Sequence, residues 1–253
     1  KICDAKNTLV NLYAIDYETE KYLDDVNFKF SCVGTSCDIG KTSSDEFGNY
    51  GLNEYVPSCV NADIKSYKEN YNFGKLTLST NEGVSGYVIM KPYHNLKVNV
   101  KIVDNGIIRE PYNDENVFVN FIDGEDSFNQ FLNGNDINLI IGDYTIRAYI
   151  MKESDTPIKV VGDTVESCTD IPKSGIFGVL GIKEKKCFTS QLEDVELNQV
   201  LVGGNEFAWN YDGKGSEIII YVTFDGVPKT VNEMGEIYNK ILDKNRVKYP
   251  EVI

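Results

Sequence analysis

Apolar and polar residues alternate along most of this chain, and a period of two residues predicts β-strands. In segments 96–102 and 144–150 every second residue is apolar, and the residues between are mostly polar. This pattern is typical of an antiparallel strand that buries one face. Segment 218–224 is apolar on nearly both faces, which predicts a central strand covered on each side.

Other short segments repeat the pattern and are separated by Gly, Asn and Asp. We expect strands in them as well, at 8–15, 26–32, 37–42, 48–53, 59–66, 73–79, 86–91, 116–122, 136–141, 195–201 and 206–211. Short strands at intervals of roughly 8 to 12 residues indicate β-sandwiches, so the expected fold class is all-β.

One amphipathic helix is expected at about 230–245. Thr230 and Glu233 form a capping box, in which the threonine accepts from the N3 amide and the glutamate reaches back. The residues that follow at three- and four-residue steps form one apolar stripe: Val231, Met234, Tyr238, Ile241 and Leu242. We expect this stripe to dock on its own domain, with a neighbouring molecule as the alternative. Segment 245–253 reads as a loosely held tail or a link to more protein.

The strand pattern restarts near Pro92, which predicts two domains, 1–92 and 93–253. A glycine- and lysine-rich excursion at about 153–190 interrupts the second domain and contains Cys168 and Cys187. A loop of that length is usually functional or tethered. A Cys168–Cys187 bridge would tether it and contribute roughly 3 kcal/mol by constraining the unfolded chain.

Six cysteines favour disulfide bonds and an oxidising, extracellular compartment: Cys3, Cys32, Cys37, Cys59, Cys168 and Cys187. None lies in a C-x-x-C motif, and a single histidine disfavours a Cys/His zinc site. If consecutive strands alternate in direction, the first four cysteines lie at one pole of the first domain. Two pairings remain open: Cys3–Cys32 with Cys37–Cys59, which we favour slightly, or Cys32–Cys37 with Cys3–Cys59.

The formal net charge of −14 and the pI near 4.6 argue against a nucleic-acid surface, which needs clustered Lys and Arg. No apolar run approaches the roughly 20 residues that cross a bilayer, so no membrane span is expected. Because the sequence begins at Lys1 without Met, we expect a mature product or an excised fragment whose signal peptide is gone.

Candidate catalytic residues are few, and we expect no enzyme activity. His94 is the only histidine and sits at the proposed domain junction, where an ordinary exposed linker residue is the competing interpretation. The G-x-S-x-G motif is absent, and bridged cysteines offer no thiol nucleophile. Carboxylates are plentiful, but no spacing fixes two of them as a glycosidase pair.

Two candidate binding sites remain. The loop with Asp123, Glu125 and Asp126 clusters the oxygens that Ca²⁺ prefers, although it lacks the EF-hand pattern and also fits a solvated hairpin. Calcium is the one cofactor considered. Phe207, Trp209 and Tyr211 share a strand face that could form a ligand platform for sugars, although core packing explains the same spacing better.

Residues 42–52 read T-x-x-D-x-x-G-x-Y-x-L, and residues 23–26 read Leu-Asp-Asp-Val. Together they resemble the carboxypeptidase-regulatory-like and Cna-B-like β-sandwich modules. The cysteine-bearing form, SCVGTSC followed by VPSC, is similar to modules in predicted secreted proteins of small-genome, host-attached archaea, as are GIFGVLGIKEKKC and VLVGGNEFAWNYD. The resemblance covers 8–75 and, more loosely, 95–240. It implies an extracellular structural or adhesive role and brings no catalytic residues.

The sequence therefore predicts two tandem Ig-like or carboxypeptidase-regulatory-like β-sandwich domains with a short C-terminal α-helix. The expected function is that of a secreted structural or adhesion protein of the cell surface. We expect it to associate with copies of itself, into a filament or surface layer, or with other surface proteins, through the apolar strand edge at 8–12 and the tail. The alternative is a module that binds a glycan or a host protein.

Overall fold

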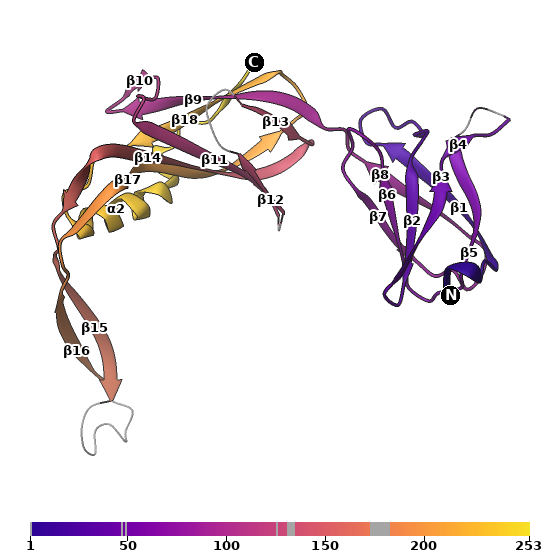
Figure 1. Ribbon diagram of the computed structural model, residues 1–253, viewed down its shortest axis with the longest axis horizontal. Helices are drawn as coiled ribbons and strands as arrows, with labels where there is room; N and C mark the ends of the chain where they lie inside the picture. The colour runs from indigo at the N-terminus through magenta and orange to yellow at the C-terminus, as the bar shows by residue number, and fades with distance from the viewer. Residues whose placement is uncertain (1, 47, 49, 125, 131–134, 173–182) are drawn as a thin grey trace. The chain divides into compact units, whose positions relative to one another are not determined.

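The computed structural model describes residues 2–46, 48, 50–124, 126–130, 135–172 and 183–253 (Figure 1). The chain forms two compact units. Unit 1 comprises Lys1–Asn95 with Asn138–Ile141, and unit 2 comprises Leu96–Ile137 with Gly142–Ile253. The short return of 138–141 to unit 1 is fixed by a 2.8 Å hydrogen bond from Lys91 Nζ to the carbonyl of Ile141.

Unit 1 is a sandwich of two four-stranded sheets. The first has the order β4-β5-β1-β8, with strands β1 (Thr8–Asp16), β4 (Ser43–Ser44), β5 (Tyr50–Val56) and β8 (Val84–Met90). The second has the order β3-β2-β6-β7, with strands β2 (Asn27–Cys32), β3 (Thr35–Lys41), β6 (Ala62–Tyr67) and β7 (Gly74–Leu78). All pairs are antiparallel except β1 with β8.

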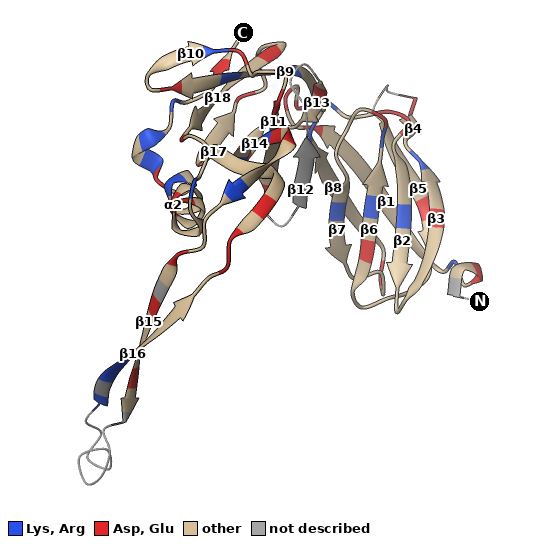
Figure 2. Cartoon of the chain, turned by 60° about the vertical axis from the view of Figure 1, so that its left-hand side comes forward, with Lys and Arg blue, Asp and Glu red and all other residues tan. Residues whose placement is uncertain are grey.

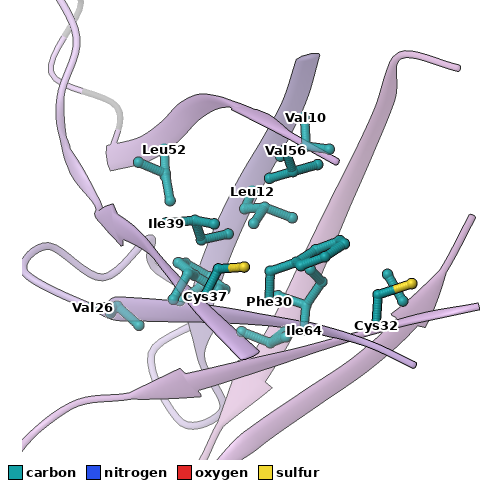
Figure 3. Close-up of a cluster of buried hydrophobic side chains, with 14 of the residues drawn as sticks. Val10, Leu12, Val26, Phe30, Cys32, Cys37, Ile39, Leu52, Val56 and Ile64 are labelled. Carbon is teal, nitrogen blue, oxygen red and sulfur yellow. The ribbon is translucent and has the colours of Figure 1, made fainter. Parts of the chain in front are cut away.

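The core of unit 1 lies between these two sheets. It consists of the side chains, every second one along each strand, that point toward the opposite sheet. Val10 and Leu12 of β1 face Phe30 of β2 and Ile64 of β6, and all four are fully buried (Figure 3). Because β1 has β5 on one side and β8 on the other, it is a central strand. The predicted free edge at 8–12 is therefore wrong.

Two disulfides close one end of unit 1, Cys3–Cys37 and Cys32–Cys59. Both predicted pairings are wrong, although the four cysteines do share one pole. The β2–β3 turn places Cys32 opposite Thr35, whereas Cys37 lies opposite Phe30. The 3₁₀ turn η1 (Ile2–Asp4) contacts β3, so Cys3 meets Cys37 and leaves Cys32 to the β5–β6 connection.

Unit 2 contains a nine-stranded sheet. Its main order is β10-β9-β18-β17-β14-β11-β12, with β13 paired to β9 and β19 paired to β18. The strands are β9 (His94–Asp104), β10 (Ile107–Arg109), β11 (Glu115–Asp123), β12 (Asp126–Gln130), β13 (Asp136–Leu139), β14 (Gly142–Val160), β17 (Val195–Tyr211), β18 (Glu217–Phe224) and β19 (Glu251–Val252). Strands expected separately at 195–201 and 206–211 are thus one strand.

The sheet of unit 2 divides into two packed layers at the β17–β18 junction, where the only register pair is Gly203 with Phe224. Between the layers lie Leu96 and Val100 of β9, Phe121 of β11 and Ile146 of β14, which are all essentially buried. With unit 1, this arrangement confirms the predicted all-β sandwich fold with one α-helix near the C-terminus.

Helix α2 (Val231–Ile241) covers the outer face of β17. Thr230 accepts from the Glu233 amide as predicted, and the Glu233 carboxylate accepts from the Lys229 amide at 2.6 Å. The buried residues are Ile237 and Ile241, whereas Tyr238 and Leu242 of the predicted stripe are exposed.

Gly204 of β17 explains why the buried side of the helix differs from the predicted stripe. A Cβ there would lie 2.5 Å from the Ala148 carbonyl oxygen and 3.0 Å from Ile241 Cδ1. The missing side chain lets Ile241 seat directly on the strand, which sets the face that the helix buries.

The C-terminal segment is held by the sheet, so the expectation of a loosely held tail is wrong. Strand β19 pairs with β18, and Tyr249 packs edge-on against Phe207 with their ring centroids 5.9 Å apart. Lys248 Nζ lies 3.3 Å from the ring centroid of Tyr221, so the tail covers the outer face of β18.

Asp16 fastens the end of β1 to the segment that precedes β7. Its carboxylate accepts hydrogen bonds from the Tyr71 hydroxyl at 2.6 Å and from the amides of Glu18 and Thr19 at 2.8 Å. Burial raises the pKa of Asp16, but these hydrogen bonds outweigh it and hold that pKa below its usual 3.8. Burial and the hydrogen bond to Asp16 raise the pKa of Tyr71 to about 12.

These shifts predict how the stability of unit 1 depends on pH. The folded form of Tyr71 keeps its proton up to about pH 12, whereas the unfolded form loses it near pH 10. The contribution of Tyr71 is therefore full below pH 10 and is lost as pH rises from 10 to 12. Tyr71→Phe should lower the free energy of unfolding at pH 7 by about 1.5–3 kcal/mol, the loss of a hydrogen bond to a carboxylate.

The variant should also flatten the decline in stability between pH 10 and 12. Pulse proteolysis in urea would measure the unfolding midpoint of unit 1, and the fluorescence of Trp209, the only tryptophan, would report unit 2 as an internal control. If the stability of unit 1 fell equally steeply between pH 10 and 12 in the unaltered protein and in Tyr71→Phe, the hydrogen bond from Tyr71 to Asp16 would not be the cause of that fall.

Candidate functional site

The predicted aromatic platform is not a surface. Phe207 is 2% exposed and Tyr211 1% exposed, because both point between the layers of unit 2. Trp209 is half-buried and stacks on Tyr211, with centroids 5.4 Å apart, and contacts Phe121 and Tyr144 edge-on or tilted. The strand face that these residues share belongs to the core, so the platform interpretation is wrong.

The predicted calcium loop is only partly described. Asp123 ends β11, but Glu125 and the side chain of Asp126 lie outside the described residues. Among the described side chains, one cluster has metal-ligand spacing: Glu166 with Cys168 and Cys187. Both sulfurs of that cluster are joined in a disulfide, and a bridged sulfur is not the thiolate that binds metals.

His94 pairs with Glu18 in unit 1, with Nε2 and Oε1 2.5 Å apart. It is thus not simply an exposed linker residue: the pair joins the start of β9 to the turn after β1. The Glu18 carboxylate fixes the orientation of the His94 imidazole.

The expected excursion at about 153–190 is mostly regular β-structure. Strands β14 and β17 extend to Val160 and from Val195, and beyond them β15 (Thr164–Pro172) and β16 (Lys183–Gln191) form a separate two-stranded ribbon (Figure 1). The long-loop interpretation is wrong here because the strands alternate polar and charged residues with few apolar ones. From sequence alone, a polar segment without a hydrophobic period is predicted to be a loop.

Cys168 and Cys187 face each other directly in the ribbon, with their Cα atoms 4.0 Å apart. A two-stranded hairpin alone is marginally stable in water, because it has no second layer to bury a face. The disulfide therefore supplies the stability that a core gives elsewhere, and the sequence-based prediction that this pair tethers the segment agrees with the observed bond.

The three disulfides should differ in what they stabilise. Removing the Cys32–Cys59 bridge with a double substitution to Ala should lower the free energy of unfolding of unit 1 by about 3.5 kcal/mol, the loop-closure value for a separation of 27 residues. Removing Cys168–Cys187 in the same way should leave the unfolding of both sandwiches unchanged but expose the ribbon to proteases.

Urea unfolding followed by pulse proteolysis measures the first effect. Limited trypsin digestion with mass mapping measures the second, because cleavage would occur at Lys183, Lys185 or Lys186. A fall in the stability of unit 2 on loss of the ribbon disulfide would contradict this division of roles.

The outer face of the sheet β4-β5-β1-β8 carries aromatic and aliphatic side chains. On β8, Tyr87 is 61% exposed and Ile89 52% exposed. They lie beside Tyr13 and Ile15 of β1, whose neighbours Leu12 and Ala14 point into the core. The solvent-facing side of an antiparallel sandwich is normally polar, so this composition marks the face as a candidate binding surface.

A groove opens beside Tyr13, and we call it the Tyr13 groove. It has a volume of about 450 Å³. Its lining residues come from β1, β3, β4, β5 and the connection after β4: Tyr13, Gly40, Lys41, Ser43, Ser44, Asp45, Gly51, Leu52, Asn53 and Glu54.

Two glycines shape the Tyr13 groove. A Cβ on Gly51 would lie 2.8 Å from Tyr13 Cε1, so the tyrosine ring lies against the bare backbone of β5. Gly40 has φ +138°, which an L side chain rarely adopts, and a Cβ there would meet Leu52 at 3.0 Å. The ring of Tyr22 lies tilted beside Tyr13, with centroids 5.6 Å apart.

The sites predicted from the sequence do not include this surface, although segment 8–15 contains a signal for it. In segment 8–15 the core set is Val10, Leu12 and Ala14, and the intervening set also contains apolar residues, Leu9, Tyr13 and Ile15. A strand that needs only one apolar face but has two indicates either a buried central position or a functional outer face.

Comparisons with known proteins give weak similarities. No protein-family model matches the chain, and no curated protein matches it either. Among solved structures, a leucine-rich repeat protein from Bacteroides thetaiotaomicron is 12% identical with a TM-score of 0.25, over 87% of this chain and 26% of that one. This chain thus spans about a quarter of that protein.

Two pilin structures are similar at the same level. A streptococcal ancillary pilin is 11% identical with a TM-score of 0.29, over 87% of this chain and 63% of that one. The shaft pilin SpaA from Lactobacillus rhamnosus GG is 10% identical with a TM-score of 0.24, over 87% and 98%. Similarity this low leaves function to be argued from the chain itself.

Proposed function

We propose that this chain is a non-enzymatic extracellular structural or adhesion protein. The observation that carries the proposal is the pairing of all six cysteines in three disulfides, two of which close one end of a β-sandwich. Disulfides of this kind persist in oxidising compartments and are rare in the cytosol. Within the described part of the chain, no helix is long and apolar enough to cross a membrane.

The proposed role is mechanical. Sandwich layers with buried cores and covalent cross-links keep a fixed shape where chaperones and refolding are not available. The sole histidine pairs with Glu18, and every cysteine sulfur is bridged, so no cysteine offers a thiol nucleophile. The resemblance of residues 8–75 to carboxypeptidase-regulatory-like and Cna-B-like modules supports the same role.

Self-association is the finer part of the proposal. The predicted routes through 8–12 and the tail are closed, because β1 is central and β19 already pairs with β18. Strand β8 offers another route: it ends the order β4-β5-β1-β8 and has β1 as its one partner in the described sheet. An edge strand presents unpaired amides and carbonyls, which a strand of a second copy can satisfy.

Two measurements test the proposal. Thiol titration of the denatured, unreduced protein from its natural source should find no reactive cysteine, and six reactive groups would overturn the extracellular assignment. Sedimentation velocity at rising concentration should show association. Ile89→Pro, which blocks the β8 edge, should abolish it, while Val195→Pro at the start of β17 serves as a control far along the chain.

A second candidate function is contact with an anionic lipid surface through the ribbon. Lys183, Lys185 and Lys186 lie at the start of β16, opposite the end of β15. Figure 2 shows basic residues at this end of the ribbon. The sequence that joins β15 to β16 reads KSGIFGVLGI, which contains no acid, and its residues lie outside those described. Basic residues beside an apolar sequence that contains no acid favour the surface of an anionic membrane.

Vesicle flotation tests this candidate, with phosphatidylcholine vesicles that contain or lack phosphatidylglycerol. The triple variant Lys183→Glu, Lys185→Glu, Lys186→Glu should weaken binding to the anionic vesicles roughly 100-fold, because each lysine contributes about 1 kcal/mol at such a surface. A control with three exposed lysines elsewhere reversed, at Lys21, Lys97 and Lys214, should bind normally. Equal binding of both variants would reject the ribbon as the contact.

A further inference from the structure

The Tyr13 groove continues into a row of residues that crosses the whole first sheet of unit 1. Ser43 of β4 lies beside Gly51 of β5, the ring of Tyr13 of β1 lies against Gly51, and Tyr87 of β8 lies beside Tyr13. Adjacent strands are about 4.8 Å apart, so this row extends across roughly 14 Å of the outer face. It combines a hollow at one end with an exposed ring at the other.

The groove offers two kinds of contact. Tyr13 presents an aromatic ring, and Tyr22 extends the aromatic surface beside it. Ser43, Ser44 and Asn53 bring hydroxyl and amide groups, which both donate and accept hydrogen bonds. A ligand that fits must have flat apolar faces and many hydroxyl groups, and these are the two properties of a sugar ring.

The charges of the groove favour an uncharged ligand. Lys41, its one basic lining residue, pairs with Asp25 at 2.8 Å. The acidic lining residues are Asp45 and Glu54, and Glu54 lies 4.0 Å from Lys6, so the lining disfavours an anionic ligand. The chain as a whole has a net charge of −14, which repels polyanions. A volume of about 450 Å³ lies within the range of small-ligand sites, so the groove suits a short stretch of an oligosaccharide.

We infer that the Tyr13 groove and the row that ends at Tyr87 form a binding site for a neutral glycan. The ring of Tyr13 stacks on one face of a sugar ring. Asn53 and the serine hydroxyls of β4 form hydrogen bonds with the hydroxyl groups of that sugar, and Tyr87 contacts the next part of the oligosaccharide. Gly51 is a requirement of the site, because any side chain there would displace the ring of Tyr13. This activity goes beyond the structural role proposed above and does not depend on self-association.

The test uses the full chain on an array of neutral oligosaccharides that includes cello-, chito- and mannohexaose, followed by isothermal titration with the strongest ligand. Tyr13→Ala and Tyr87→Ala should each weaken binding about tenfold or more, the equivalent of about 1.4 kcal/mol. Tyr238→Ala, which removes an exposed tyrosine from α2, should bind as the unaltered protein does. Circular dichroism and urea midpoints would establish that the variants are folded.

A conservative change separates stacking from hydrogen bonding. Tyr13→Phe keeps the ring and should retain most of the affinity, and Asn53→Ala should reduce it without changing stability. Binding should also be insensitive to salt, since the site recognises no charge.

Three results would overturn the inference: no binding to any neutral oligosaccharide, equal binding by Tyr13→Ala, or binding to acidic glycans alone. Loss of self-association in Tyr13→Ala without glycan binding would also overturn it, because the face would then be an interface between copies. The thiol titration is independent of all these outcomes, so failure of the glycan site leaves the extracellular assignment standing.

Discussion

Burial of one strand face between two layers is the constraint on which the rest of this structure depends. A β-strand has two faces, and a sandwich buries one of them against the opposite sheet. In β1 the core takes Val10, Leu12 and Ala14, so whatever else the strand does must use Leu9, Asn11, Tyr13 and Ile15. The same rule explains why Phe207 and Tyr211 are not a ligand platform: they occupy the inner face of β17.

The alternating pattern predicted this constraint well, and it predicted the strands and the fold class with it. The pattern did not predict which neighbours a strand has, because pairing depends on contacts between segments far apart in the chain. Segment 8–12 was expected at an edge and lies at the centre, since the parallel partner β8 comes from more than 70 residues away. The disulfide pairing was not predictable for the same reason. Four cysteines at one pole can pair in several ways, and the observed pairing depends on the packing of η1 against β3.

Local chemistry set other limits on prediction. The Thr230 cap fixed where α2 begins, but the buried side of the helix depends on Gly204, a residue of another element. The side chains described in the ribbon of β15 and β16 form no buried face, and its sequence lacks the hydrophobic period by which strands are recognised. What the sequence did contain was Cys168 and Cys187, and the bond between them replaces the missing second layer. Candidate surfaces were missed because the outer faces were assumed to be polar.

Stability and recognition therefore use different atoms of the same strands. The cross-links and the inner faces hold the layers of unit 1 in place, and because they do so the outer face of β1, β5 and β8 is free to vary. Gly51 illustrates the division: its backbone pairs with Ser43 of β4, while the absence of its side chain makes room for the ring of Tyr13. A side chain at this position would change the groove and leave the core untouched, so a glycine here is better explained by the outer face than by the fold.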